Sequence, residues 1–400
     1  MSNDRPIYLD NHATTRLDPE VLEAMMPFLQ DDYGNAGSRT HSFGTRARDA
    51  VEQARAQVAD LVDADPGDVI FTSGATEANN LAIKGLVGQD EPGHVVTVQT
   101  EHHAVLDVCR SLERRGWRVS YLAVASDGRL DPALLESTMC EDTRLVSVMW
   151  ANNETGVLHD VEAIGAICRA RGVTFHSDAV QAVGRVAVSL KGTPADLLSL
   201  SGHKLYGPKG IGALVVRRRT RRRLAPLLHG GGQERGLRPG TVPVAQVVGL
   251  GRAAELAVEE LRQGREAARL TALRDALLAR LAKEAGDVEV NGSVVHRLPG
   301  NLNVWFRGVD TEALAIQCRD VAFSTGSACT SASLDPSHVI LATTGDEERA
   351  SQSARFGLGR FTTDDDIDRA AATIASAVRE LRPLTRAPRH QAGLERDTRS

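Results

Sequence analysis

The sequence predicts an α/β protein with a mostly parallel, buried sheet in its first part and a smaller α+β lobe after it. Two observations lead to this prediction. Short apolar runs alternate with stretches of helical periodicity through the first two-thirds of the 400 residues, and the runs are nearly continuous, which is typical of parallel strands buried on both faces. A chain of this length also exceeds what one hydrophobic core usually supports, so we expect two lobes.

Each element of the first lobe follows from its local pattern. "VEQARAQVADLV" (51–62) has apolar residues at helical spacing, and "DVIFTSG" (68–74) is a short apolar strand that ends in a glycine turn. "TEANNLAIKGLV" (76–87) is helical again. The same alternation predicts further helices at 104–116 and 160–172, and further strands at 94–100, 143–150, 173–178, 196–202 and 212–216.

A long helical pattern at 243–285 separates this part from a C-terminal segment of different texture. We place the boundary between the lobes inside this helix. Strand-like runs follow at 302–304 and 321–323. The tail from residue 385 is polar, so we expect it to fray.

Composition excludes several classes of protein. Hydrophobic residues make up 42% of the chain, charged residues 25%, and the net charge is −5, so nothing global attracts DNA or an anionic membrane. No apolar run is long enough to span a bilayer, and the first residues lack the order of a signal peptide, so we expect a cytoplasmic protein. Five cysteines without a CxxC pair favour reduced thiols over disulfides or a structural zinc site: Cys109, Cys140, Cys168, Cys318 and Cys329.

Polar residues follow the predicted strands, where an open α/β sheet binds its ligand. The turn at Gly74 leads into a helix whose first N–H groups could hold a phosphate, with the hydroxyl of Thr76 as a further donor. An N-cap role explains Thr76 equally well and is preferred when this stretch is taken alone. Other strands are followed by Glu101, His102, His103, Asp178, Gln181, Ser201, His203 and Lys204.

Lys204 is the most informative of these residues. It lies between Gly, Ser and His residues directly after an apolar strand, and a desolvated lysine amine can form a Schiff base with a carbonyl cofactor. Pyridoxal phosphate requires such a lysine, a phosphate cradle, and a carboxylate for its ring nitrogen. Thr76, Asp178 and Lys204 supply all three, although each alone reads more simply as a capping or surface residue.

The segment "STGSACTSAS" (324–333) surrounds Cys329 with small residues. Such a run is usually a turn, and a free cysteine is usually a small buried hydrophobe. A reactive thiol is the alternative, and this stretch alone does not decide between them.

Eight motifs together resemble, in this order, those of the NifS/IscS-type cysteine desulfurases of the class V aminotransferase group. They are "YLDNHATT", "FTSGATEANNLAIKG", "TEHHAVLD", "NNETGV", "HSDAVQAVG", "SGHKLYGPKGIGAL", "HGGGQERGLRPGT" and "STGSACTSAS". The resemblance implies the aspartate aminotransferase fold of pyridoxal-phosphate enzymes, with a mostly parallel seven-stranded sheet in a large domain. The implied division is a large domain at 16–257, a small domain formed by 1–15 and 258–384, and a tail at 385–400.

The resemblance also implies roles for single residues. Lys204 corresponds to the lysine that binds pyridoxal phosphate, and His102 to the imidazole that stacks on its ring and assists proton transfer. Arg355 corresponds to the residue that holds the substrate carboxylate in a bidentate geometry. The remaining matches are Asp178 for the pyridine nitrogen, Gln181 for the ring oxygen, Ala75, Thr76, Ser201 and His203 for the phosphate, Asn153 for cofactor and substrate, and Thr241 for a phosphate across the dimer interface.

The implied activity is conversion of L-cysteine to L-alanine in a homodimer. The thiolate of Cys329 takes the sulfur as a persulfide and passes it to an acceptor protein, such as an iron–sulfur scaffold or a tRNA-thiolation enzyme. Neither a nucleic acid, a membrane nor a metal is expected as a direct partner. A selenocysteine lyase-like enzyme and a non-catalytic assembly subunit that binds the cofactor remain as alternatives.

Two further features carry weaker interpretations. The arginine cluster at 217–223 is most simply the start of a solvated helix face, with an acidic protein partner favoured over nucleic acid as a further role. His12 belongs to a motif near the implied site, but we interpret it as an ordinary polar loop residue.

Overall fold

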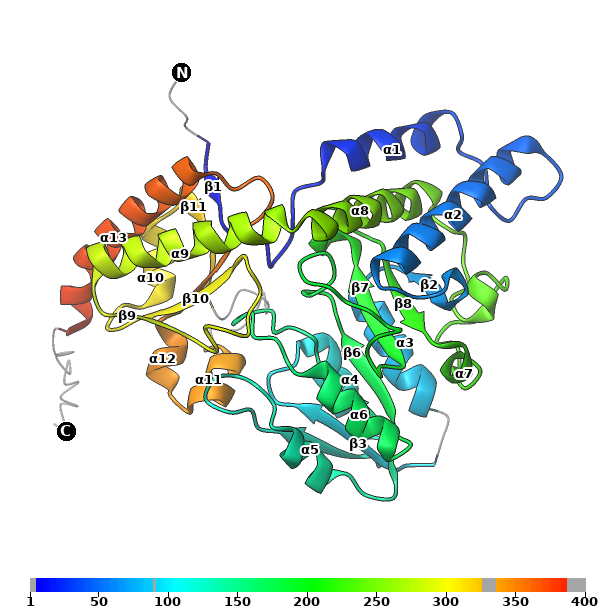
Figure 1. The fold of residues 1–400 in the computed structure, drawn as a ribbon, viewed down its shortest axis with the longest axis horizontal. Coiled ribbons are helices and arrows are strands. Elements are labelled where there is room, and N and C mark those ends of the chain that lie inside the picture. The colour runs from blue at the N-terminus through cyan, green and yellow to red at the C-terminus, as the bar shows by residue number, and fades with distance from the viewer. Residues whose placement is uncertain (1–4, 89–90, 326–335, 387–400) are drawn as a thin grey trace, which may run out of the picture.

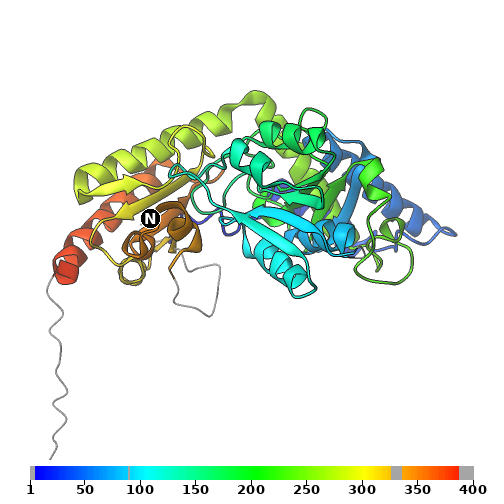
Figure 2. The same ribbon diagram turned by 90° about the horizontal axis from the view of Figure 1, so that it is seen from below.

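The computed structural model describes residues 5–88, 91–325 and 336–386, and shows two lobes side by side (Figure 1). The two long helices α8 (Val244–Gln263) and α9 (Arg265–Ala285) run end to end across both lobes, as Figure 2 also shows. Within the described part of the chain, no helix combines the length and apolar character needed to cross a bilayer.

The larger lobe contains the predicted sheet of seven strands. In spatial order these are β2 (Val69–Thr72), β8 (Gly212–Val216), β7 (Leu197–Ser201), β6 (Thr174–Asp178), β5 (Thr143–Ser147), β3 (His94–Val98) and β4 (Arg118–Leu122). Only β8 runs antiparallel to its two neighbours, and all the other pairs are parallel. The expectation of a mostly parallel sheet is therefore confirmed.

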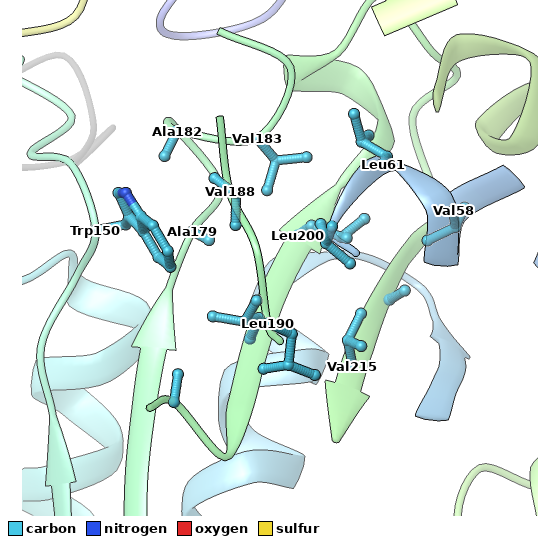
Figure 3. Close-up of a cluster of buried hydrophobic side chains, with 14 of the residues drawn as sticks. Val58, Leu61, Trp150, Ala179, Ala182, Val183, Val188, Leu190, Leu200 and Val215 are labelled. Carbon is cyan, nitrogen blue, oxygen red and sulfur yellow. The ribbon is translucent and has the colours of Figure 1, made fainter. Parts of the chain in front are cut away.

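Both faces of this sheet are buried, which explains the continuous apolar runs. Leu198 and Val215 belong to one hydrophobic cluster, whereas their chain neighbours Leu197 and Leu214 point to the other face and belong to a second cluster. Figure 3 shows part of the first cluster, where Leu200 and Val215 of the sheet lie near side chains of helix α2 (Ser42–Leu61).

Helices and short turns cover the sheet and connect its strands. They are α1 (Pro19–Gln30), α3 (Ala75–Val87), α4 (His103–Glu113), α5 (Pro132–Thr138), α6 (Val161–Ala170) and α7 (Arg218–Arg221), with 3-10 turns η1 (Pro66–Asp68), η2 (Gly202–Lys204) and η3 (Glu234–Gly236). Lys204 is the last residue of η2, which directly follows β7, so it lies at the edge of the sheet.

The smaller lobe has its own sheet and its own core. Its antiparallel strands are β12 (Ser324–Thr325), β13 (Ser353–Gly357), β10 (Asn301–Phe306) and β9 (Val288–Val290), while β1 (Ile7–Tyr8) pairs in parallel with β11 (Val321–Ala322). Its helices are α9, α10 (Thr311–Gln317), α11 (His338–Thr344), α12 (Glu347–Ser351) and α13 (Asp364–Arg386).

The helix that the sequence predicts at 243–285 is interrupted, which corrects the prediction of one continuous helix. Gly264 separates α8 from α9 with a left-handed φ of 65°. The buried residues of α8 belong to the core of the larger lobe, and those of α9 to the core of the smaller lobe. The division at 257/258 stays a prediction.

The arginine cluster largely forms a solvated helix face, in agreement with the interpretation: Arg218, Arg219, Arg222 and Arg223 are exposed, whereas Arg217 and Arg221 are half-buried. Arg217 donates to the backbone oxygens of Ala195 (2.7 Å) and Thr193 (3.0 Å), and Arg221 is paired with Asp68 at 3.3 Å. Helix α7 is a single turn of four residues. Arg217 and Arg221 therefore bind the chain just before strands β7 and β2, while the exposed arginines face solvent.

The segment at residues 9–18 joins the two lobes. Leu9 and Asn11 donate to Ala322 and Gly357 of the smaller lobe, whereas Thr15 and Asp18 donate to backbone oxygens of the larger lobe. The segment thereby lies beside the carboxyl edge of the seven-stranded sheet, where the candidate site is found.

Candidate active site

A cavity of about 590 Å³ opens at the carboxyl edge of the large sheet. Ten of the predicted site residues line it: Ala75, Thr76, His102, Asn153, Asp178, Gln181, Ser201, His203, Lys204 and Arg355. Two do not. Thr241 lies outside the cavity lining and is exposed, and Cys329 falls outside the described residues.

The glycine turn before α3 forms one wall of the cavity. Gly74 is the N-cap residue and has a φ of 152°, a backbone conformation that favours glycine. No side chain caps the helix, so the N-cap interpretation of Thr76 is wrong: Thr76 is the second residue of the helix. The first N–H groups and the positive end of the helix dipole suit an anion here.

Lys204 lines the cavity just after the end of strand β7. Its Nζ donates to the backbone oxygen of Ala13 at 2.7 Å and also to that of His12. The joining segment therefore fixes where the amine lies.

Asp178 ends strand β6 with its carboxylate held by two donors. Nδ2 of Asn79 donates to Oδ2 at 2.7 Å, and the backbone N–H of Val180 donates to Oδ1 at 3.0 Å. Both bonds fix the orientation of the carboxylate, which can pair with a protonated ring nitrogen.

His102 is both the N-cap of α4 and part of the cavity wall. Its Nδ1 accepts the backbone N–H of Ala104 at 3.1 Å, so a neutral ring carries its proton on Nε2. Burial lowers the pKa of His102, and the nearby charge of Lys204 adds to this effect while Asp178 opposes it. The capping bond thus sets both the orientation and the tautomer of the ring.

His12 departs from our interpretation as an ordinary polar loop residue. It is 1% exposed, lines the cavity, and its Nδ1 lies 2.9 Å from Oε1 of Gln181. Burial holds its pKa well below the usual range, and the charges of Arg185 and Arg355 lower it further. His12 is therefore a neutral imidazole in the site.

Sequence reasoning missed Arg185 and Asp10. Arg185 donates to the backbone oxygen of Asn11 at 2.9 Å and to Oε1 of Gln181 at 3.2 Å, and Asp10 forms an ion pair with Arg355 at 2.8 Å. The contacts of Arg185 with Asn11 and of Asp10 with Arg355 join residues far apart in the chain, so local periodicity does not predict them.

Glu101 is a buried acid behind the cavity. Its side chain is fully buried, and Oε1 accepts the backbone N–H of Met149 at 2.5 Å. Burial raises its pKa well above the usual range, and the negative charge of Asp178 raises it further. Burial at this position therefore favours the protonated form of Glu101.

A buried ion pair fixes the loop that leads to Thr241. Arg55 binds Glu234 through two hydrogen bonds of 2.7 and 2.9 Å, with side chains 5% and 4% exposed. Glu234 also accepts the backbone N–H of Phe71 at 2.8 Å. Glu234 and Arg235 have φ values of 47° and 59°, so the loop is held in a strained backbone conformation.

Unpartnered polar atoms indicate what the cavity can bind. Nε2 of His12, Oδ1 of Asn153 and Nε of Arg355 are buried without a hydrogen-bond partner among the described residues. These atoms lie in the same cavity as the amine of Lys204, the carboxylate of Asp178 and the turn at Gly74. Together the groups fit a cofactor with a carbonyl, a ring nitrogen and a phosphate, with the carboxylate of an amino acid beside it.

Comparison with known proteins agrees with this geometry. The family model "Aminotransferase class-V" matches residues 7–370. The chain is 53% identical over 382 residues to "Cysteine desulfurase IscS" of Anaeromyxobacter sp. (strain Fw109-5), covering 95% of this chain and 94% of that protein. It is 50% identical to "Cysteine desulfurase" of Mus musculus, covering 95% and 83% of the two chains.

Solved structures resemble the fold closely. A "NIFS-LIKE PROTEIN" superposes with a TM-score of 0.87 at 34% identity, covering 94% of this chain and all of the other. A structure described as "SspA in complex with cysteine" superposes with a TM-score of 0.79 at 36% identity, covering 89% and 99% of the two chains.

Proposed function

The chain belongs to the class-V aminotransferase family and is a cysteine desulfurase, and we propose that it takes the sulfur of L-cysteine as a persulfide on Cys329 and releases L-alanine. The family implies pyridoxal phosphate as the cofactor. One observation carries the proposal for the residues: Lys204, Asp178, His102 and Arg355 line the same cavity at the carboxyl edge of the sheet.

The residues of the cavity would hold pyridoxal phosphate at its distinct groups. Lys204 supplies the amine for the aldehyde carbon and Asp178 the carboxylate for the pyridine nitrogen. His102 would pack against the ring and Gln181 would bind the ring oxygen. The phosphate group is assigned to Ala75, Thr76, Ser201 and His203. When bound, the cofactor supplies an electron sink for the substrate's α-carbon.

Arg355 and Asn153 are proposed to hold the amino acid substrate. The guanidinium of Arg355 is 4% exposed, and its Nε needs an acceptor that a carboxylate provides. Oδ1 of Asn153 is the matching acceptor for a donor of the cofactor or substrate. His102, with its proton on Nε2, can donate a hydrogen bond within the same cavity.

Cys329 performs the sulfur transfer in this proposal. Its thiolate attacks the substrate sulfur, a sulfur–sulfur bond forms and the carbon–sulfur bond breaks. The bonding electrons stay with the substrate carbon, which takes up a proton as alanine forms. The persulfide then passes to an acceptor protein, for which an iron–sulfur scaffold or a thiolation enzyme is the expected class. The names of the curated relatives and the cysteine complex of a structural neighbour support cysteine as the substrate.

The homodimer and the cytoplasmic location belong to the same proposal. Thr241 lies on the surface and outside the cavity lining, as a residue that contributes to the site of a second copy would. The pair formed by Arg55 and Glu234 holds the preceding loop in place for that purpose.

Replacement of Lys204 tests the assignment of the cofactor. Lys204→Ala should lose the visible absorbance of the lysine-bound cofactor and the borohydride-fixed mass on the Lys204 peptide. Lys191→Ala is the matched control, since Lys191 is 59% exposed and pairs with Asp63 on the surface. A borohydride-reducible adduct that survives in Lys204→Ala would refute the assignment.

A further inference from the structure

We propose that Asp10 and Ser324 are positioning residues for sulfur transfer. They join Arg355 to the strand that leads toward Cys329, so that carboxylate binding and the attack by the thiol depend on one hydrogen-bonded unit. The inference rests on the proposed function, because it takes Arg355 as the carboxylate-binding residue and Cys329 as the sulfur acceptor. Neither Asp10 nor Ser324 is among the residues that the sequence motifs assign to the site.

The unit is a closed triangle of side chains. Nη2 of Arg355 donates to Oδ1 of Asp10 at 2.8 Å and to Oγ of Ser324 at 2.7 Å. The hydroxyl of Ser324 in turn donates to Oδ1 of Asp10 at 2.7 Å. Arg355 and Ser324 are 4% and 3% exposed, so the bond between them is buried, and the two bonds to Asp10 are partly buried. Each member therefore fixes the positions of the other two.

Three segments that are distant in sequence meet at this triangle. Ser324 pairs with Arg355 in the ladder between β12 and β13, and Asp10 forms an isolated bridge to Gly357 on the same edge of β13, opposite β10. Strand β12 is the last described element before residues 326–335, which include Cys329. A shift of Arg355 is thus passed to the chain only five residues before the reactive thiol.

The chain after this segment is tied to the same wall of the cavity. The hydroxyl of Ser337 donates to the buried carboxyl group of Glu154, while Oγ also caps α11 by accepting the N–H of Ile340 at 3.1 Å. Next to Glu154 in the chain, the backbone oxygen of Asn153 accepts a hydrogen bond from Nη1 of Arg355 at 2.9 Å. Serine hydroxyls therefore connect both sides of the Cys329 segment to the surroundings of Arg355.

The charge of Asp10 gives the triangle a further effect. A substrate carboxylate that binds Arg355 must share the guanidinium with the carboxylate of Asp10, and the two like charges repel. Asp10 therefore weakens the binding of the substrate carboxylate, while its hydrogen bonds hold the side chains of Arg355 and Ser324 in position. The charge of Asp10 should therefore lower the affinity for the substrate but raise the rate of sulfur transfer.

Ser324→Ala tests the connection without changing charge. Persulfide formation on Cys329 in a single turnover should slow roughly tenfold, since a buried bond to charged groups is lost. To measure cysteine binding without sulfur transfer, Cys329→Ser is added to the parent and to the variant. The affinity for cysteine, followed by the absorbance of each holoenzyme, should differ by less than about twofold. Ser376→Ala is the control, because that half-buried serine lies on α13 outside the cavity lining, where its hydroxyl donates to Glu380 at 3.4 Å.

Asp10→Asn tests the role of the charge. It keeps an acceptor oxygen but removes the repulsion, so cysteine and L-alanine should bind several-fold more tightly while persulfide formation slows. General damage to the cavity would weaken binding instead. Thermal unfolding of the holoenzyme confirms that each variant is folded at the assay temperature.

Three results would overturn the inference: parental transfer rates in Ser324→Ala, equal losses of binding and transfer in that variant, or weaker binding in Asp10→Asn. Failure of the proposed function is recognised separately. In that case the parent enzyme itself would form neither alanine nor a persulfide on Cys329, and this reaction is run first.

Discussion

Neutral imidazoles surround the amine of Lys204. Burial lowers the pKa of His12 and His102, and burial together with the charges of Lys204 and Lys209 lowers that of His203 to about 4. The fixed positive charges that line the cavity are therefore those of lysine and arginine side chains. This arrangement favours a phosphate and a carboxylate without placing further cations against the cofactor ring.

Glu101→Gln should stabilise the protein as pH rises. The pKa of Glu101 is higher in the folded protein than the ordinary value of 4.5, so the unfolded chain loses this proton at lower pH. The parent protein therefore loses stability as pH rises from 4.5 to the pKa of the folded state. Glutamine keeps the acceptor for Met149 but does not ionise. Relative to the parent, the free energy of unfolding of Glu101→Gln should therefore rise by up to about 1.4 kcal/mol for each pH unit above 4.5, until the folded pKa is reached.

Urea denaturation of both holoenzymes at a series of pH values measures this difference. Other titrating groups are shared by the two proteins, so their contributions cancel. A constant difference across the series would mean that Glu101 is ionised in the folded protein.

At the scale of elements, periodicity predicts the buried framework well. The strands at β2, β3, β5, β6, β7 and β8 follow from continuous apolar runs, because both faces of each strand are covered. The edge strand β4 was not predicted, since four of its five residues are partly or fully exposed and its sequence "RVSYL" lacks such a run. The break at Gly264 was missed because a single glycine within a helical pattern is compatible with an uninterrupted helix.

The site could be predicted where motifs lie next to strand ends. The placement of Lys204, Asp178 and His102 in one cavity follows from parallel strands that end at a common edge. The burial of His12 and the pairing of Asp10 with Arg355 depend instead on how the joining segment packs between the lobes. That packing involves residues far apart in sequence, which periodicity does not detect.

The loop between Leu227 and Thr241 should depend on the buried pair formed by Arg55 and Glu234. Arg55→Leu leaves the carboxylate of Glu234 buried without its cation, so the free energy of unfolding should fall by about 3–5 kcal/mol. Arg110→Ala is the matched control, because Arg110 pairs with Asp107 on the surface and such pairs contribute at most about 1 kcal/mol. Denaturation midpoints that agree for the parent and Arg55→Leu would contradict this role of the pair.

At the scale of the whole molecule, the proposed dimer predicts complementation between two defective copies. Lys204→Ala destroys the site of its own chain, and Thr241→Ala weakens the site of its partner. In a mixed dimer, one site then has an intact Lys204 together with an intact Thr241 from the other copy. Mixing the variants under subunit exchange should therefore restore one fully active site per heterodimer.

Sedimentation and activity of tagged, purified heterodimers measure this outcome. If Thr241 acts within its own chain, the heterodimer would show no more activity than the separate variants. A monomer with the full activity of the parent would contradict the shared site itself.

The central claim is that Cys329 accepts the sulfur of cysteine, and intact-protein mass spectrometry tests it most directly. The holoenzyme is mixed with L-cysteine without reductant, its peptides are mapped, and alanine is assayed in parallel. We predict one added sulfur on the Cys329 peptide together with alanine, and neither product from the Lys204→Ala variant. Alanine formation with an unmodified Cys329 peptide, or normal sulfide release by Cys329→Ser, would contradict the account.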